Sequence, residues 1–139
     1  MKALILIPML FRIGYAQDLK TKDVPRAVRD ALTQKYPQAA RVGWEKENGN
    51  FEANWGGRSG EDHSVQFSPD GTFVEEVDAM AVKDLPPSVA EYVKTHYHTP
   101  IREAGRRLDA KGKHTFEIGI RGKDLLFTPE GKFLREEHG

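Results

Sequence analysis

Cysteine is absent from this 139-residue sequence, and neither sign of charge is in excess, since there are 21 basic and 21 acidic residues. Without cysteine the chain has no disulfide bond, no thiolate metal site and no cysteine nucleophile, so its fold depends on a packed core. A formal net charge of zero gives no overall field that would attract nucleic acid or an anionic membrane. We therefore expect neither as a partner.

The first residues have the pattern of an export signal. Lys2 precedes an apolar stretch over residues 3–10, and the small residues Gly14 and Ala16 stand three and one positions before the polar Gln17. This order of charge, short apolar stretch and small residues is typical of a signal peptide, and the stretch is too short to cross a bilayer.

Two residues are unusual for such a signal, because Pro8 interrupts the apolar stretch and Arg12 follows it. An irregular N-terminal element of a cytosolic protein would also fit them. We predict a signal peptide over residues 1–16, a mature domain over residues 17–139 without a membrane anchor, and periplasmic or secreted localisation. Removal of Lys2 and Arg12 would leave 19 basic against 21 acidic residues, so the mature chain would be weakly acidic.

The rest of the sequence contains an internal repeat. Residues 23–28 (DVPRAV) recur 61 positions later as residues 84–89 (DLPPSV). Residues 65–71 (VQFSPDG) recur 60 positions later as residues 125–131 (LLFTPEG). An internal repeat of this length predicts that one structural unit occurs twice.

Each copy opens with a helix signal, in which an aspartate and an apolar residue precede a proline suited to the first helical turn. We expect Asp23 and Asp84 to act as N-caps or as charge partners of the helix N-termini. Apolar residues then recur at steps of three and four, as on one face of a helix. Pro37 and Pro100 predict the two helix ends.

After each helix the apolar period changes to two, which is typical of half-buried strands, and Gly-containing turns separate the alternating segments. We predict strands over residues 41–47, 50–56, 62–68, 72–78, 102–109, 114–120, 122–128 and 132–137. The predicted fold class is α+β, with two tandem repeats over residues 23–77 and 84–137, each one helix packed on a four-stranded antiparallel meander sheet. Because one copy is marginal in size, the two should share a core or extend one sheet.

The repeated motifs resemble those of the PepSY-like family of small exported bacterial proteins. The matching stretches are residues 23–37, 42–53 and 64–71, with residues 84–97, 116–117 and 125–131 in the second copy. That family is described as similar to beta-lactamase-inhibitor protein. The resemblance implies helices on one side of antiparallel sheets and an open, concave face on the other, which in the inhibitor grips an enzyme.

The two tryptophans stand on neighbouring predicted strands. Alternation places Phe51, Ala53 and Trp55 together under the first helix, which favours core packing for the aromatic residues. An outward-facing Trp44 would instead be the anchor of a partner patch. We predict a partner-binding site on the open face that contains Trp44, Glu45, Asn54, Ser64 and Gln66.

The histidines form no strong catalytic or metal pattern. His96 and His98 at a helix end, with His114 elsewhere, lack an acidic residue at ligand spacing. His63 stands between Asp62 and Ser64 on a strand, where neighbouring side chains point to opposite faces and cannot form a triad together.

Glu45, Glu47 and Glu52 lie across the hairpin at Asn48-Gly49, where close carboxylates can in principle do acid–base chemistry. We expect a solvated hairpin face instead, because no nucleophile, phosphate loop or cofactor motif accompanies them. The sequence therefore predicts no enzyme, no cofactor and no metal site.

Three functions compete. The leading one is an exported, non-catalytic binding module for a protein or peptide of the cell envelope, including an enzyme inhibitor acting through the open sheet face. The alternative is a periplasmic carrier of a small ligand or peptide, with a cleft between the repeats. A hydrolase or metal enzyme would need a convergent set of titratable groups that the sequence does not offer.

Overall fold

The computed structural model describes residues 17–137. The signal peptide predicted over residues 1–16 lies outside this range, so it stays a prediction. The elements follow one another as β1 (Gln17–Leu19), η1 (Thr21–Asp23), α1 (Arg26–Lys35), β2 (Gly43–Glu47), β3 (Asn50–Trp55), β4 (His63–Phe67), β5 (Phe73–Met80), η2 (Val82–Asp84), α2 (Pro87–Tyr97), β6 (Glu103–Asp109), β7 (His114–Ile120), β8 (Lys123–Phe127) and β9 (Phe133–Glu137).

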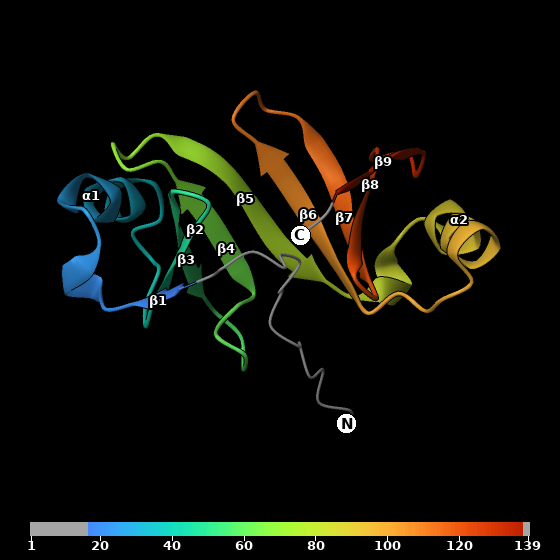
Figure 1. The fold of residues 1–139 in the computed structure, drawn as a ribbon, viewed down its shortest axis with the longest axis horizontal. Coiled ribbons are helices and arrows are strands. Elements are labelled where there is room, and N and C mark those ends of the chain that lie inside the picture. The colour runs from blue at the N-terminus through green and yellow to red at the C-terminus, as the bar shows by residue number, and fades with distance from the viewer. Residues whose placement is uncertain (1–16, 138–139) are drawn as a thin grey trace.

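All nine strands belong to one antiparallel sheet, in which every strand pairs with its neighbours in the sequence (Figure 1). The predicted arrangement as two tandem repeats, each with its own four-stranded sheet, is wrong. Strand β5 pairs with β6 from Glu75–Asp109 to Met80–Ala104. This pairing supplies partners for the backbone N–H and C=O groups that two separate sheets would leave exposed at their edges.

The eight predicted strands are confirmed individually, with ends that differ by no more than two residues. The ninth, β1, pairs with β2 from Gln17–Lys46 to Leu19–Trp44. It has only three residues, which is too short for an alternating pattern to reveal.

Helices α1 and α2 lie near opposite ends of the sheet (Figure 1) and pack on the same face. The register shows this, because residues 76, 78 and 80 of β5 share one face of the sheet. Val65, in the core under α1, pairs with position 76, and Ala104, in the core under α2, pairs with position 80. We call this the helix side and the opposite side the helix-free face.

The N-cap positions belong to prolines rather than to the predicted aspartates. Pro25 and Pro86 precede the two helices, and neither helix has a side-chain cap. Asp23 and Asp84 lie in the short 3₁₀ turns η1 and η2, so their predicted role as N-caps is wrong. Each aspartate lies two residues before the N-cap position, and the apolar residue between aspartate and proline packs into the core.

Two separate apolar clusters lie between the helices and the sheet. The first contains Val28 and Leu32 of α1 against Ala53, Val65 and other strand residues, and the second contains Val89 and Val93 of α2 against the corresponding strands. The predicted placement of Phe51, Ala53 and Trp55 under the first helix is confirmed. Each helix thus stabilises its own end of the sheet.

The two ends of the sheet have equivalent registers. Trp55–His63 and Val65–Glu76 are register pairs of the first half, and Ile120–Lys123 and Leu125–Glu136 take the same places in the second. A tyrosine at each helix end completes the equivalence: the hydroxyl of Tyr36 donates to Glu76, and that of Tyr97 donates to Glu136 over 2.6 Å.

The hairpin turn between β4 and β5 touches the first helix. Gly71 has φ +87°, which favours glycine, and a Cβ there would lie 2.6 Å from the backbone oxygen of Ala27. In the second half Gly131 also has φ +87°, but a Cβ there would meet the side-chain oxygen of Ser88 at 2.2 Å. Both turns therefore require glycine, for partly different reasons.

Candidate functional site

The helix-free face carries most of the carboxylates of the described strands. The registers place on it Asp18, Glu45, Glu47, Glu52, Glu75, Glu103, Asp109, Glu117, Asp124 and Glu137. The basic residues that these strands place there are Arg107 and Arg135. This face therefore has ten acidic groups against two basic ones.

The helix side of the same strands is balanced in charge. Its basic residues are Lys46, Arg106 and Lys123, and its acidic residues are Glu76, Asp78 and Glu136. A chain whose charges balance in total therefore concentrates negative charge on one side of its sheet.

Four of the five predicted partner-binding residues lie on the helix-free face: Glu45, Asn54, Ser64 and Gln66. The hydroxyl of Ser64 donates a 2.6 Å hydrogen bond to Asn54 Oδ1, and Gln66 Nε2 lies 3.5 Å from Glu52 Oε2. Asn54, Ser64 and Gln66 are buried, whereas Glu45 and Glu52 are half-buried. The two glutamates are thus the more accessible groups of this patch.

Trp44, the fifth predicted residue, lies on the helix side and belongs to the core under α1. It pairs with Ala53 in the register and is 5% exposed. The role of a partner anchor required an outward-facing ring. The structure instead gives Trp44 the packing position that alternation also allowed.

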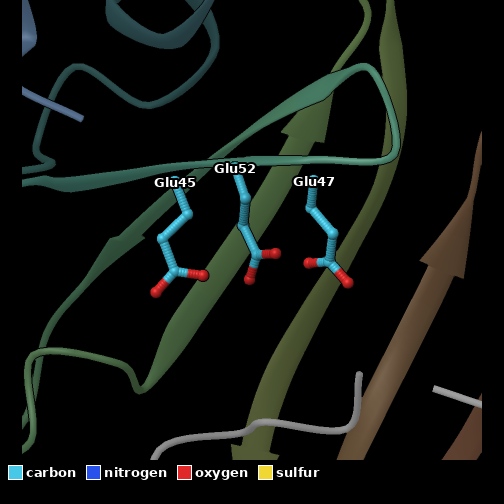
Figure 2. Close-up of side chains that lie close together, drawn as sticks. All are labelled: Glu45, Glu47 and Glu52. Carbon is cyan, nitrogen blue, oxygen red and sulfur yellow. The ribbon is translucent and has the colours of Figure 1, made fainter. Parts of the chain in front are cut away.

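Glu45, Glu47 and Glu52 point to the same side of the β2–β3 hairpin (Figure 2). One carboxylate oxygen from each lies within 4.8 Å of the others. The expected solvated hairpin face is wrong for Glu47, which is 3% exposed. Carboxylate oxygens gathered in this way suit a hard cation such as Ca²⁺ or a basic side chain.

Arg107 gathers three carboxylates from three strands. Its Nε lies 3.0 Å from Glu75 Oε2, and its Nη1 lies 2.7 Å from Glu137 Oε1 and 3.9 Å from Glu117 Oε1. Burial tends to lower the pKa of Arg107, but the three carboxylates raise it above its ordinary value. The guanidinium is therefore a fixed positive charge that ties β6 to β5, β7 and β9.

Position 47 in the first half corresponds to position 107 in the second. Residues 46–47 pair with residues 50–51 as residues 106–107 pair with residues 115–116. The same place on the helix-free face therefore holds a carboxylate in one half and a guanidinium in the other.

Sequence reasoning missed Arg107 and its three carboxylates. Alternation alone places Arg107 and Glu117 on the face opposite the core, but it cannot say which strands become neighbours. The pairing of β5 with β6 brings Glu75 to Arg107, and the expectation of a shared core or one extended sheet did not say which strands would meet. A charged residue at an outward position of every strand except β4 was the available signal.

The histidines lie apart from these carboxylates. His96 is exposed and stacks on Tyr92 with ring centroids 3.9 Å apart, His98 caps α2 at φ 52°, and His114 is exposed at the start of β7. Within residues 17–137, the group of side chains close enough to share a metal consists of glutamates and includes no histidine. His63 and Ser64 point to opposite faces, as expected from alternation.

No family model matches the sequence, and no curated protein matches it. Solved structures do share the fold. One from Bacteroides eggerthii, described as one of the "putative periplasmic proteins", has a TM-score of 0.67 at 22% identity and covers 83% of this chain and 88% of its own. A DUF2874 family protein from Bacteroides ovatus has a TM-score of 0.67 at 21% identity, covering 84% of this chain and 89% of its own.

A BLIP-like protein from Bacteroides fragilis has a TM-score of 0.62 at 20% identity and covers 82% of this chain and 86% of its own. BLIP abbreviates beta-lactamase-inhibitor protein. The chain therefore has a BLIP-like fold, which it shares with DUF2874 proteins. These three proteins are named by compartment, family or likeness to an inhibitor, and none is named as an enzyme.

The predicted periplasmic or secreted localisation agrees with the compartment named for the Bacteroides eggerthii protein. Neither helix within the described residues is long and apolar enough to cross a membrane.

Proposed function

We propose that this chain is an exported, non-catalytic binding module of the PepSY-like kind. Its partner is a protein or peptide of the cell envelope that presents lysine and arginine to the helix-free face. The ten-to-two excess of acidic groups on that face carries the proposal. The repeated motifs and the fold shared with DUF2874 and BLIP-like proteins support it.

Charge decides the class of partner. A neutral or acidic surface placed over these carboxylates would remove water from them without compensation, which is unfavourable. A basic surface replaces that water with charge-assisted hydrogen bonds and is attracted from a distance.

The first half offers the better contact. Glu45 and Glu52 are half-buried beside buried Glu47, whereas the corresponding place in the second half holds Arg107. A basic side chain of the partner that reaches Glu45 and Glu52 would make charge-assisted hydrogen bonds with them.

The test compares two double variants of equal charge change. Glu45→Gln with Glu52→Gln alters the helix-free face, and Asp30→Asn with Glu91→Gln alters exposed positions on the two helices. Partners retained from an envelope extract are identified, purified and titrated against each variant by calorimetry at low and high salt. We expect the first variant to weaken binding at least tenfold and to reduce its salt dependence, and the second to stay within twofold. Equal affinity of both variants, or a partner with an acidic contact surface, would contradict the proposal.

Inhibition of an enzyme is the form of binding that the BLIP-like name adds. A beta-lactamase is therefore the first enzyme to assay, by following hydrolysis of a chromogenic substrate as the chain is added. The Glu45→Gln and Glu52→Gln variant should lose any inhibition that the wild-type chain shows. Undiminished hydrolysis would remove beta-lactamase as a partner and leave the binding proposal to the calorimetry.

A further inference from the structure

A cavity of about 200 Å³ opens on the helix side of the first half, away from the acidic face. It lies between the C-terminal end of α1 and strands β3, β4 and β5, so it is not a cleft between the halves. The polar and aromatic side chains that line it are Tyr36, Gln38, Trp55, His63, Glu76 and Asp78.

Two aromatic rings and two carboxylates meet in this cavity. The ring centroids of Tyr36 and Trp55 are 5.2 Å apart, and Trp55 lies 5.4 Å from the His63 ring. The hydroxyl of Tyr36 donates to Glu76, and His63 Nδ1 lies 2.7 Å from Asp78 Oδ1. Burial, together with this bond to Glu76, raises the pKa of Tyr36, so the phenol keeps its proton and remains the donor of this hydrogen bond.

The equivalent place in the second half contains a lysine. Lys123, which has the register position of His63, places its Nζ 3.5 Å from Glu136 Oε1 and 5.7 Å from the centroid of the Tyr97 ring. Glu136 and Tyr97 are the counterparts of Glu76 and Tyr36. In the second half the ammonium group of Lys123 therefore occupies the site, where it contacts both the Glu136 carboxylate and the Tyr97 ring.

We propose that the first-half cavity binds the protonated amine of a ligand, which takes the position that Lys123 Nζ occupies in the second half. His63 is shorter than lysine and turns to Asp78, which leaves space beside the Tyr36–Glu76 pair. The Trp55 and Tyr36 rings attract a cation through their faces, and Glu76 supplies the opposing charge. A volume below the roughly 300–1,000 Å³ of larger ligand sites suits one alkylammonium group.

Titration with butylammonium tests the proposal, with butanol as the neutral comparison. The Trp55 indole N–H resonance of the purified protein reports occupancy, and Trp44 in the core serves as the internal reference. We expect saturable shifts of Trp55 with the amine and none with the alcohol. Equal shifts with both, or no saturable response of the folded protein to the amine, would overturn the proposal.

Three variants locate the site. Glu76→Gln keeps an acceptor for Tyr36 but removes the charge, and we expect it to weaken binding at least tenfold. His63→Lys places a lysine where the second half has Lys123, and we expect it to abolish binding by filling the cavity. Glu136→Gln makes the same change as the first variant in the second half, and it should leave affinity within twofold. Thermal unfolding verifies that each variant is folded. Wild-type affinity in Glu76→Gln or His63→Lys would refute the assignment.

The ammonium group can come from a free amine or from a lysine side chain, and a second titration separates these sources. Nα-acetyl-lysine amide is compared with butylammonium and with its Nε-acetylated form, which has no charge. Binding at least tenfold tighter than butylammonium assigns the site to a lysine of a peptide, and equal or weaker binding assigns it to a free amine. Binding of the Nε-acetylated form as tight as that of the charged form would again refute a cation site.

Discussion

The two halves of the sheet differ in the positive charges that they supply to themselves. The second half places Arg107 among carboxylates on the helix-free face and Lys123 between Tyr97 and Glu136 on the helix side. The first half has Glu47 and His63 at these two positions. The same backbone arrangement thus carries two charge patterns, and both proposals concern positions where the first half has Glu47 or His63 in place of Arg107 or Lys123.

The phenylalanines at the start of β5 and β9 have different neighbours in the two halves. Lys35 Nζ lies 4.3 Å from the centroid of the Phe73 ring in the first half. In the second half Tyr92 stacks on Phe133 with centroids 4.6 Å apart. The equivalent residues Phe73 and Phe133 are thus covered by a cation in one half and by an aromatic ring in the other, contacts that an aromatic face can make with either group.

Removing the positive charge of Arg107 should have the largest effect on stability. Arg107→Gln leaves Glu75, Glu117 and Glu137 facing one another without the guanidinium, and we expect it to lower the free energy of unfolding by about 3–5 kcal/mol. Urea unfolding measures the loss. Arg106→Gln, an exposed neighbour on the other face, should change stability by less than about 0.5 kcal/mol. A similar small change for both would show that the cluster is not a structural link.

The two glycine turns differ in the helix atom next to the glycine, which is the Ala27 backbone oxygen at Gly71 and the Ser88 side-chain oxygen at Gly131. Gly71→Ala combines strain at positive φ with a clash against the Ala27 backbone oxygen, and should cost about 2–4 kcal/mol. Gly131→Ala is made in a Ser88→Ala background and compared with Ser88→Ala alone, so that the lost hydrogen bond from the Ser88 hydroxyl to Gly131 O cancels. The new Cβ then meets no backbone atom and lies 3.2 Å from Pro86 Cβ, so the change should cost mainly the strain, about 1–2 kcal/mol. Thermal unfolding of the two variants decides the order. Equal losses would mean that the clash at Gly71 is relieved by movement of α1.

The same glutamate substitution should have opposite signs in the two halves. Glu52 pairs with Glu45 in the register, so Glu52→Gln removes a like-charge contact and should stabilise the chain by about 0.2–1 kcal/mol. Glu117 instead faces Arg107, so Glu117→Gln should destabilise it. Chemical denaturation of both variants gives the signs. If Glu52→Gln raises the free energy of unfolding and also weakens partner binding, Glu52 serves binding rather than stability.

A carboxylate pair that spans the two halves makes the stability depend on pH. Burial, with a further contribution from Glu61 of the first half, raises the pKa of Glu103 to about 7 from an ordinary 4.5. Between these values the folded chain binds a proton that the unfolded chain has released, so the free energy of unfolding falls as pH rises through this window. Below the window this contribution is fully present.

Glu103→Gln should therefore flatten the stability profile between pH 5 and 8, and it should stabilise the chain more at the upper end. Thermal unfolding across this range measures the profile. Glu91→Gln on the exposed face of α2 is the control and should leave the shape of the profile unchanged. A wild-type profile in Glu103→Gln would assign the pH dependence to other groups.

Local elements were readable from the sequence because their causes are local. Proline ended each helix, alternation marked eight strands, and turn glycines separated them. The size of one copy led us to expect a shared core or one extended sheet, and the structure has the extended sheet with two separate cores. Which alternative holds was not readable, because alternation is the same for an edge strand and for a strand paired on both sides. The β5–β6 pairing depends on which strands meet in space, and α2 separates these two strands in the sequence.

The candidate site was predicted in part for a similar reason. Glu45, Asn54, Ser64 and Gln66 were placed on the helix-free face by period alone, but the same period left two orientations open for Trp44. Their burial was not predictable, since it depends on neighbouring strands. The cavity at Tyr36 and Glu76 joins residues 40 positions apart and has no motif in the sequence.

The pairing of β5 with β6 also limits how this chain can be divided. Each half hides the other's strand edge, so a fragment that ends after Met80 would expose the full length of β5 to any strand it meets. Two such fragments could pair along that edge and so satisfy the backbone hydrogen bonds of both β5 strands. The join in the middle of the sheet therefore keeps these two strand edges from pairing with another chain.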